Sequence, residues 1–402
     1  MRVGMFGIVA CMAAFMSGVA AAEPWDPCGE VAAWPGREWR LTEATALGWD
    51  AAKLTDAKTK FEMLQSASVV IVHKGRLIAA WGDDAERFTA QSVRKGLLNS
   101  LVGILVDDGK LSLDATLADL GIDDSEPPLT EAEKQASLRD LLHSRSGIFH
   151  SALYEVGGWK RMRAELAREK SETGGYAPGD YWIYNNWDFN ALGTIVEDAA
   201  GEPIGAFFEE KIAKPIAMQD FRPKDVEYTT KDHPAEQRFN NVSDHRAYMF
   251  NISTRDLARY GVLYLGCGKW KSREIVSKDW VLASLDGIDT RRGRGPDEQH
   301  TGFGDYGYLW QIDRPGARRY PELKTREPAY FATGNRGHVL AVFPYLDLVI
   351  AHQVGTRGGV SMEAQKKRAI EGSPEVTDEE MTDLFKAIIA AHPAGATALD
   401  GQ

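Results

Sequence analysis

Several catalytic signatures are missing from this chain. It has no His-Glu-x-x-His, no paired Cys-x-x-Cys, no phosphate-binding loop, no Gly-x-Gly-x-x-Gly and no Gly-x-Ser-x-Gly. The nine histidines are scattered without the spacing of metal ligands. These absences disfavour zinc hydrolases, nucleotide-binding enzymes and esterases built on a nucleophile elbow, and we expect no metal site.

Positive charge and cysteine are also scarce. With 47 Lys and Arg against 58 Asp and Glu, the formal net charge is −11, so a broad basic surface for nucleic acid is not expected. The chain has three cysteines, too few for a disulfide framework. An oxidising compartment would permit a disulfide between Cys28 and Cys267, and two unpaired thiols are an equally acceptable interpretation.

The longest apolar run lies at the start of the chain. Val3–Val19 follows Arg2 and is shorter than the roughly 20 residues of a membrane helix. It ends in three alanines, the small-residue pattern at which signal peptidase cuts. We therefore predict that residues 1–22 are an export signal cleaved after Ala22. The mature protein is expected to be periplasmic or secreted, without stable membrane insertion.

The rest of the chain is predicted to form an irregular arm over residues 23–49, one domain over residues 50–392 and a tail over residues 393–402. Apolar periodicity predicts helices near both ends of the domain and strands next to them. The predicted helices are Asp50–Leu64, Ser92–Asp108, Ala191–Ala200, Thr254–Leu265 and one from Thr377 to just before Pro393. The predicted strands are Val69–His73, Arg76–Trp81, Tyr330–Thr333, His338–Phe343 and Leu346–Gln353.

This order of elements predicts an α+β fold. One antiparallel sheet is built from both ends of the domain, residues 50–91 and about 300–392, and is flanked by the N- and C-terminal helices. Residues 92 to about 299 form a mostly helical second lobe beside it. A cleft between two such lobes is the usual place for a ligand.

Ser92-Val93-Arg94-Lys95 contains the one Ser-x-x-Lys of the sequence. Residues three apart share a helix face, so the Lys95 amine can reach the Ser92 hydroxyl. Serine becomes a good nucleophile when a neighbouring base takes its proton, and a lysine with a lowered pKa can be that base. The alternative interpretation is a serine at a helix start followed by a solvated lysine.

Two further segments carry suitable side chains. Tyr184-Asn185-Asn186 follows a Pro-Gly-Asp turn, where a tyrosine could relay protons and an amide could orient a substrate carbonyl. Thr333-Gly334-Asn335 lies at a predicted strand, where a glycine permits close approach of a substrate and the Asn335 N–H could donate to an oxyanion. Aromatic packing is the alternative for the first segment, and Thr173-Gly174 and Thr301-Gly302 are competing Thr-Gly pairs for the second.

Together and in this order, the three segments resemble those of the penicillin-recognising serine hydrolases, nearest the class C β-lactamase-related branch with its esterases and 6-aminohexanoate-dimer hydrolases. Supporting segments are Ser137–Gly147, Pro178–Glu197, Lys214–Met218 and Ser253–Ala258. The resemblance implies a β-lactamase/transpeptidase-like fold and hydrolysis through an acyl-enzyme, without metal or organic cofactor.

The resemblance also implies a role for each residue. Ser92 is the acylated nucleophile, Lys95 its proton acceptor and Tyr184 the acid/base partner. Asn186 positions Lys95 and the substrate, and the N–H groups of Ser92 and Asn335 form the oxyanion hole. Thr333 and Gly334 belong to the same substrate-binding strand.

Two positions depart from the family pattern. Ala332 stands where relatives carry a cation before Thr-Gly, and that cation helps to bind the carboxylate of β-lactams and peptidoglycan peptides. Gly96 stands where relatives commonly have Ser. Arg336 could replace the cation if its side chain reaches the cleft.

The leading hypothesis is therefore an exported serine hydrolase that cleaves small-molecule esters or amides through Ser92. A β-lactamase or DD-peptidase is the first alternative, which Ala332 disfavours. The second alternative, from another class, is a catalytically inactive protein that binds a small ligand in the same cleft.

Overall fold

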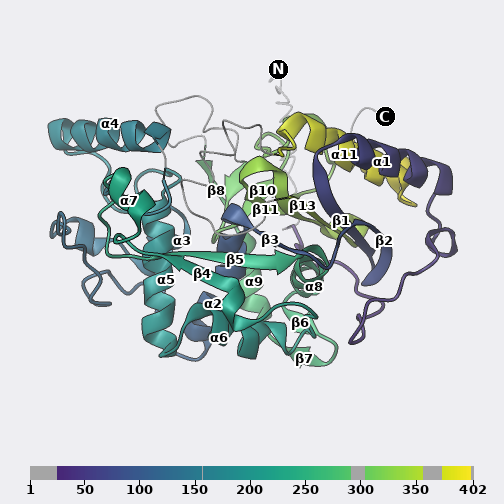
Figure 1. Ribbon diagram of the computed structural model, residues 1–402, viewed down its shortest axis with the longest axis horizontal. Helices are drawn as coiled ribbons and strands as arrows, with labels where there is room; N and C mark the ends of the chain where they lie inside the picture. The colour runs from purple at the N-terminus through teal and green to yellow at the C-terminus, as the bar shows by residue number, and fades with distance from the viewer. Residues whose placement is uncertain (1–24, 156, 291–303, 356–373, 400–402) are drawn as a thin grey trace, which may run out of the picture.

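The computed structural model describes residues 25–155, 157–290, 304–355 and 374–399 (Figure 1). Its main feature is an eight-stranded sheet with the order β2-β1-β13-β12-β11-β10-β9-β8, in which all neighbours are antiparallel. The predicted antiparallel sheet built from both ends of the domain is confirmed. The strands are β1 (Ser66–His73), β2 (Arg76–Gly82), β8 (Ile288–Asp289), β9 (Asp305–Tyr306), β10 (Gln311–Asp313), β11 (Ala329–Gly334), β12 (His338–Phe343) and β13 (Leu348–Val354).

Side chains of the central strands alternate between two apolar cores. In β1, Val70 and Val72 belong to the core shared with the second lobe, whereas Val69 and Ile71 belong to the core beneath the terminal helices. Successive residues of a strand point to opposite faces, so a strand that is covered on both sides is apolar throughout. The sheet is therefore the middle layer of the α/β lobe.

The terminal helices pack side by side on one face of the sheet. They are α1 (Ala51–Met63) and α11 (Asp378–Ala391), which contact each other along their length (Figure 1). Thr377 and Glu380 form a capping box at the start of α11, and the helix ends two residues before Pro393, as predicted. A short helix, α12 (Gly395–Ala398), follows in the segment predicted as a tail.

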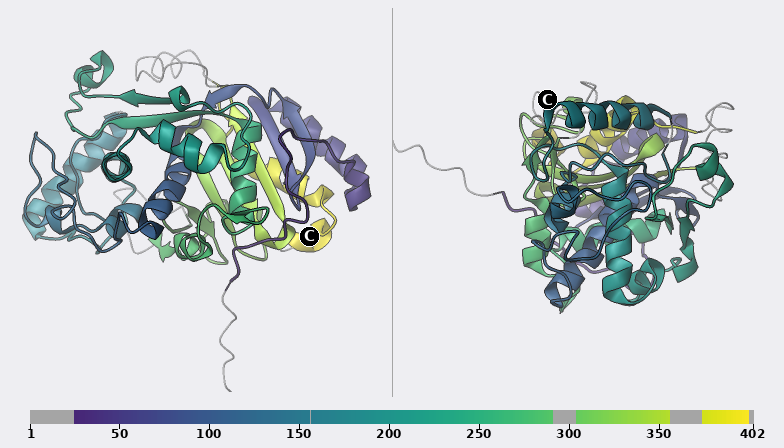
Figure 2. Two further views of the ribbon diagram at one scale, coloured as in Figure 1. Left: turned by 90° about the horizontal axis from the view of Figure 1, so that it is seen from below. Right: turned by 90° about the vertical axis from the view of Figure 1, so that its left-hand side faces the viewer.

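On the other face, α8 (Thr254–Leu265) packs against β13, β1 and β12. Next to it lies α2 (Arg94–Asp107), whose residues 94 to 105 are all buried. Helices α3 (Leu138–Leu142), α4 (Gly157–Thr173), α5 (Asn186–Ala200), α6 (Ile204–Phe208), α7 (Pro234–Arg238) and α9 (Lys278–Leu285) complete the helical part. Helices α4 and α5 lie at the end of the molecule away from α1 and α11 (Figure 2).

The second lobe contains strands that the sequence analysis missed. A three-stranded sheet has the order β3-β5-β4, and a small hairpin pairs β6 with β7. The prediction of helices and loops there was wrong for β5. Strands β8 to β10 of the main sheet were also missed, because two or three residues are too few to show a period. The strands of the second lobe are β3 (Arg87–Thr89), β4 (Val226–Thr229), β5 (Ala247–Ser253), β6 (Lys269–Trp270) and β7 (Arg273–Glu274).

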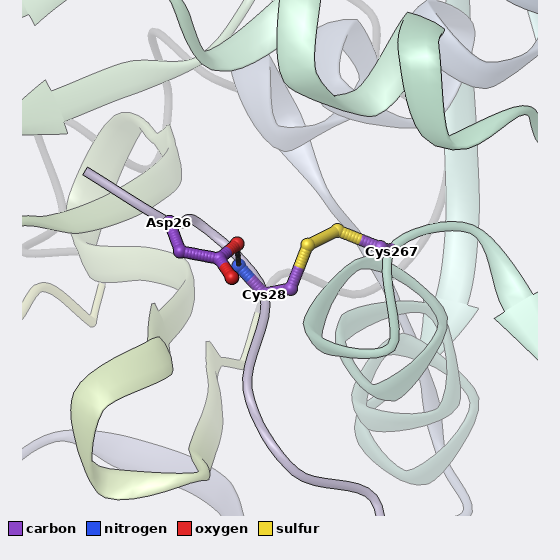
Figure 3. A group of neighbouring side chains, drawn as sticks. All are labelled: Asp26, Cys28 and Cys267. Carbon is purple, nitrogen blue, oxygen red and sulfur yellow. Dashed lines mark hydrogen bonds between the residues drawn. A yellow bond between two sulfur atoms is a disulfide. The ribbon is translucent and has the colours of Figure 1, made fainter. Parts of the chain in front are cut away.

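The N-terminal arm contains one short 3₁₀ helix, Ala44–Leu47, and is fixed to both ends of α8. A disulfide joins Cys28 to Cys267 with 5.4 Å between their Cα atoms (Figure 3). Further along the arm, Arg259 donates a hydrogen bond to the carbonyl of Arg37, and Trp39 donates one to the carbonyl of Arg255. The structure thus decides between the two interpretations of the cysteines in favour of the disulfide.

A carboxylate, Asp26, lies beside the two sulfur atoms (Figure 3). Both sulfur atoms are already bonded to each other, and a thiolate is the form that ligates a metal. The Asp26 carboxylate instead accepts a hydrogen bond from the Cys28 N–H at 3.0 Å. The disulfide and the Asp26 hydrogen bond therefore have a structural role, because they hold the N-terminal arm in place.

Within the described residues, every helix is too short or too polar to span a bilayer. The predicted export signal, residues 1–22, lies outside the described residues.

Replacing Cys28 and Cys267 together by serine is expected to lower the free energy of unfolding by about 2–4 kcal/mol, since the bond closes a long loop in the unfolded chain. Urea unfolding followed by circular dichroism measures this loss. A reducing agent should destabilise the wild-type protein and leave the double variant unchanged. Equal unfolding midpoints for the two oxidised proteins would contradict the expectation.

Candidate active site

Ser92 lies in the 3₁₀ turn that leads into α2, and Lys95 lies in the first turn of α2. Gln91–Val93 form a 3₁₀ turn that continues directly into the α-helix at Arg94. The predicted helix start is therefore correct to within two residues, and the two side chains share a face as the spacing requires. The Lys95 Nζ lies 2.8 Å from the Ser92 Oγ.

Tyr184 completes a triangle with these two residues. Its hydroxyl lies 2.6 Å from the Lys95 Nζ and 3.0 Å from the Ser92 Oγ. All three polar atoms are thus within hydrogen-bond distance of one another, the range that proton transfer needs. The fold joins two segments that are 89 residues apart in the sequence.

Lys95 is 2 % exposed, although the amine borders the cleft. The Nζ lies 4.8 Å and 4.7 Å from the ring centres of Tyr184 and Phe189. Burial, reinforced by the positive charge of Arg94, lowers the pKa of Lys95 well below its ordinary value. Within the described residues no carboxylate forms an ion pair with Lys95, so the neutral amine is favoured and can accept a proton.

The opposite holds for Tyr184. Burial raises the pKa of its phenol to about 12, with a smaller opposing contribution from the hydrogen bond with Ser92. At neutral pH the tyrosine is therefore protonated. A neutral amine beside a protonated phenol provides a base and an acid at the same hydroxyl.

The segment Ser137–Gly147 positions the Tyr184 loop. The Ser144 hydroxyl donates to the carbonyl of Ile183 at 2.8 Å and accepts from the N–H of Asn185 at 2.9 Å. Asn185 caps α5 through the N–H of Trp187. Tyr184 is therefore held between two anchored neighbours, which reduces the freedom of its ring.

The turn before Ser92 is backbone-strained. Gln91 has a φ of 53°, in the left-handed region that residues other than glycine rarely adopt, at a cost on the order of 1–3 kcal/mol. The Ala90 N–H donates to the Phe250 carbonyl at 2.9 Å and holds the chain in place. The sequence offered no signal for this strain, because glutamine is not a typical left-handed residue.

The end of β11 packs against this turn. A Cβ atom at Gly334 would lie 2.6 Å from the Ala90 carbonyl oxygen, so any larger residue would push the strand away from Ser92. Thr333 donates a hydrogen bond to the Gln311 side chain at 2.7 Å. Asn335 follows and is exposed. The close approach at Gly334 is thus one of protein main chain to protein main chain, and the predicted close approach of a substrate stays a prediction.

A cleft of about 450 Å³ lies between the lobes and brings together all seven predicted site residues: Ser92, Lys95, Tyr184, Asn186, Thr333, Gly334 and Asn335. Gln91, Arg94, Tyr154 and Met249 also line it. Arg94 stands inside the Ser-x-x-Lys motif itself, and a charged residue within an apolar helix start is the signal that could have identified it.

One expected contact is absent. In the described part of the chain, Asn186 makes no hydrogen bond with Lys95, whose partners are Ser92 and Tyr184. Asn186 is the first residue of α5, where its amide borders the cleft. The role expected for Asn186 in positioning Lys95 therefore has no direct contact behind it here and stays a prediction, while its place at the cleft is compatible with a contact to substrate.

The two departures from the family pattern meet in space. A Cβ atom at Gly96 would lie 2.9 Å from the Cβ of Ala332, which is 4 % exposed. Residue 332 is thus packed against α2 and is not among the described residues that line the cleft at Ser92. Arg336 does line the cleft, and its guanidinium lies 4.0 Å from Glu375.

Comparison with known proteins identifies the family to which the chain belongs. The family model described as Beta-lactamase matches residues 52–371. The esterase EstB of Burkholderia gladioli is 28% identical over 148 residues, which cover 33% of this chain and 37% of that protein. The chain therefore aligns with little more than a third of this esterase.

Solved structures share the fold. A penicillin-binding protein homolog from Caulobacter crescentus has a TM-score of 0.55 at 16% identity, with 84% of this chain and 97% of that chain covered. A family VIII carboxylesterase has a TM-score of 0.54 at 14% identity, with 86% and 99% covered. Identities this low establish the architecture and leave the substrate open.

Replacing Gly96 by alanine is expected to destabilise the protein. The gain in helix propensity is about 1 kcal/mol, whereas overpacking against Ala332 costs about 1–3 kcal/mol. Chemical unfolding measures the difference. A double-mutant cycle with Ala332→Gly should recover part of the loss. A higher unfolding free energy for Gly96→Ala alone would refute this close contact.

Proposed function

Because the chain belongs to the beta-lactamase family, whose members are serine hydrolases, we propose that it is an exported hydrolase of carboxylic esters or small amides. The proposed reaction passes through an acyl-enzyme on Ser92. The observation that carries this proposal is the triangle of Ser92, Lys95 and Tyr184 at the cleft.

Acylation follows from the protonation states favoured by burial. The neutral Lys95 amine accepts the hydroxyl proton while the Ser92 Oγ bonds to the carbonyl carbon. Tyr184 donates its proton to the departing oxygen or nitrogen. The lysine ammonium then returns a proton to the tyrosine, so the pair finishes in its starting state with the acyl group on serine.

Deacylation uses the same groups in reverse. A water molecule replaces the leaving group, and Tyr184 with Lys95 removes a proton from it as the oxygen attacks the ester carbon. The Ser92 oxygen recovers a proton and leaves. No group beyond the triangle is required for proton transfer in either half of the reaction.

The developing oxyanion needs two donors. The backbone N–H groups of Ser92 and Asn335 are proposed for this role. The close packing of Gly334 against the turn before Ser92 supports it, since that packing brings the two main-chain segments together. Donors fixed before the reaction stabilise the oxyanion without rearrangement.

Export of the protein is part of the proposal. The disulfide between Cys28 and Cys267 supports it, because such bonds persist in oxidising compartments. The N-terminal sequence features of an export signal point the same way, with cleavage after Ala22 as the predicted processing step.

Mass spectrometry after exposure to a fluorophosphonate tests the nucleophile. We expect modification confined to the peptide that contains Ser92 and lost in Ser92→Ala, since the hydroxyl with an adjacent base reacts selectively. Benzylpenicillin and an activated short-chain ester are used in parallel. A stable penicillin adduct would favour the β-lactamase or DD-peptidase alternative.

A matched control is available on helix α2 itself. Ser100→Ala removes a buried hydroxyl about two helical turns after Ser92, where it donates to the carbonyl of Leu97, and should leave labelling intact. Absence of labelling by all three compounds would support the catalytically inactive binding protein instead.

The pH dependence of kcat/KM tests the assigned protonation states. Since Lys95 acts as the neutral base and its pKa is lowered, the rate should rise with pH and level off well below pH 10.5. No loss from Tyr184 is expected below about pH 12. Lys95→Arg, which keeps the charge on the side chain, should lower kcat/KM by about 10²–10⁴-fold.

The exposed Lys58 of α1 supplies the control, because Lys58→Arg makes the same chemical change far from the cleft. Its pH profile should match that of the wild type. A neutral lysine base requires that kcat/KM rises or stays level between pH 6 and 9. A fall of the wild-type kcat/KM over this range would therefore rule it out.

A further inference from the structure

Arg94 is a buried cation that the proposed reaction leaves unused. It lies between Ser92 and Lys95 in the sequence, lines the cleft and is 1 % exposed. Its Nη2 donates to the Asn190 side chain at 3.0 Å, and its guanidinium carbon lies 4.3 Å from the ring centre of Tyr248.

The guanidinium is incompletely satisfied. Its Nε and Nη1 are buried, and no acceptor meets strict hydrogen-bond geometry with them. The Tyr248 phenol interacts with the guanidinium, but it is neutral and brings no compensating charge. In the described part of the chain no carboxylate pairs with it. A buried charge in this state is costly unless an opposite charge arrives.

Other buried arginines of the chain are compensated differently. Arg163 pairs with Glu155 and Arg319 with Asp378. Arg259 has no such carboxylate, but it gives both terminal nitrogens to main-chain carbonyls and does not border the cleft. Among the described residues, Arg94 therefore differs in combining burial, the lack of a carboxylate partner and a position at the cleft.

We propose that Arg94 binds a carboxylate of the substrate, so that the preferred substrates are esters or amides with a negative group a few bonds from the scissile carbonyl. This inference rests on the proposed function. Two parallel N–H groups of a guanidinium match the two oxygens of a carboxylate, and such charge-assisted bonds are the strong ones.

Three positions could supply the positive charge that binds a substrate carboxylate: residues 332, 336 and 94. Ala332 is packed against Gly96 and has no charge to offer. Arg336 reaches the cleft but already lies 4.0 Å from Glu375. Arg94 is the cleft cation whose donors point to no protein carboxylate among the described residues.

Protection of Ser92 from the fluorophosphonate tests the inference. The competing ligands are the monomethyl esters of succinic, glutaric and adipic acid, each paired with the methyl ester in which a carboxamide replaces the free carboxylate. The two members of a pair have the same shape and differ in charge. Half-protecting concentrations are compared for the wild-type protein.

For at least one chain length, the carboxylate ligand should protect at about tenfold to hundredfold lower concentration than its carboxamide partner. In Arg94→Gln this ratio should fall towards one, whereas Arg336→Gln should retain it. Equal protection by both ligands at all lengths in the wild type would overturn the inference, as would loss of the ratio in Arg336→Gln alone.

Failure of the proposed function gives a different result, because the fluorophosphonate would then not label Ser92 at all. If Arg94→Gln does not fold, Arg94→Lys replaces it. Lysine keeps the charge and lacks the planar pair of donors, so the ratio should drop severalfold. An unchanged ratio in Arg94→Lys would also overturn the inference.

Discussion

The site depends on a helix that has no solvent-exposed face over most of its length. Residues 94 to 105 of α2 are all buried, with α5, β5 and β11 packed against the helix and Tyr260 of α8 donating to the Gly96 carbonyl. Packing on every side fixes the position of such a helix. Ser92 lies just before its first turn and Lys95 within it, so their positions relative to both lobes are fixed as well. The same burial removes water from the lysine amine and favours its neutral form.

Small residues allow this helix to approach the sheet closely. Gly96 faces Ala332 with no room for another methyl group, and Gly334 lies directly against the Ala90 carbonyl. The two contacts bring β11 next to the turn that carries Ser92. Packing at this density leaves no space for a long cation at residue 332, so one cause explains both departures from the family pattern.

The fold was predictable where a period or a cap was strong. Alternating and buried runs gave the β1–β2 hairpin and β12, and the capping box at Thr377 gave the start of α11. Strands β8 to β10 were missed because two or three residues are too few to show a period. Strand β5 was missed although it is buried almost throughout, as β12 is, so burial alone does not explain the difference.

The site likewise has contacts that local spacing predicts and contacts that depend on the three-dimensional fold. The contact between Ser92 and Lys95 follows from spacing on one helix, whereas Tyr184 lies 89 residues from Lys95 and could be placed by resemblance alone. The state of Arg94 depends on what surrounds it in three dimensions, which no spacing reports. Two basic residues buried side by side raise each other's electrostatic cost. One of them relieves that cost by losing its proton, and the permanent charge of the other is relieved when an anion binds in the cleft.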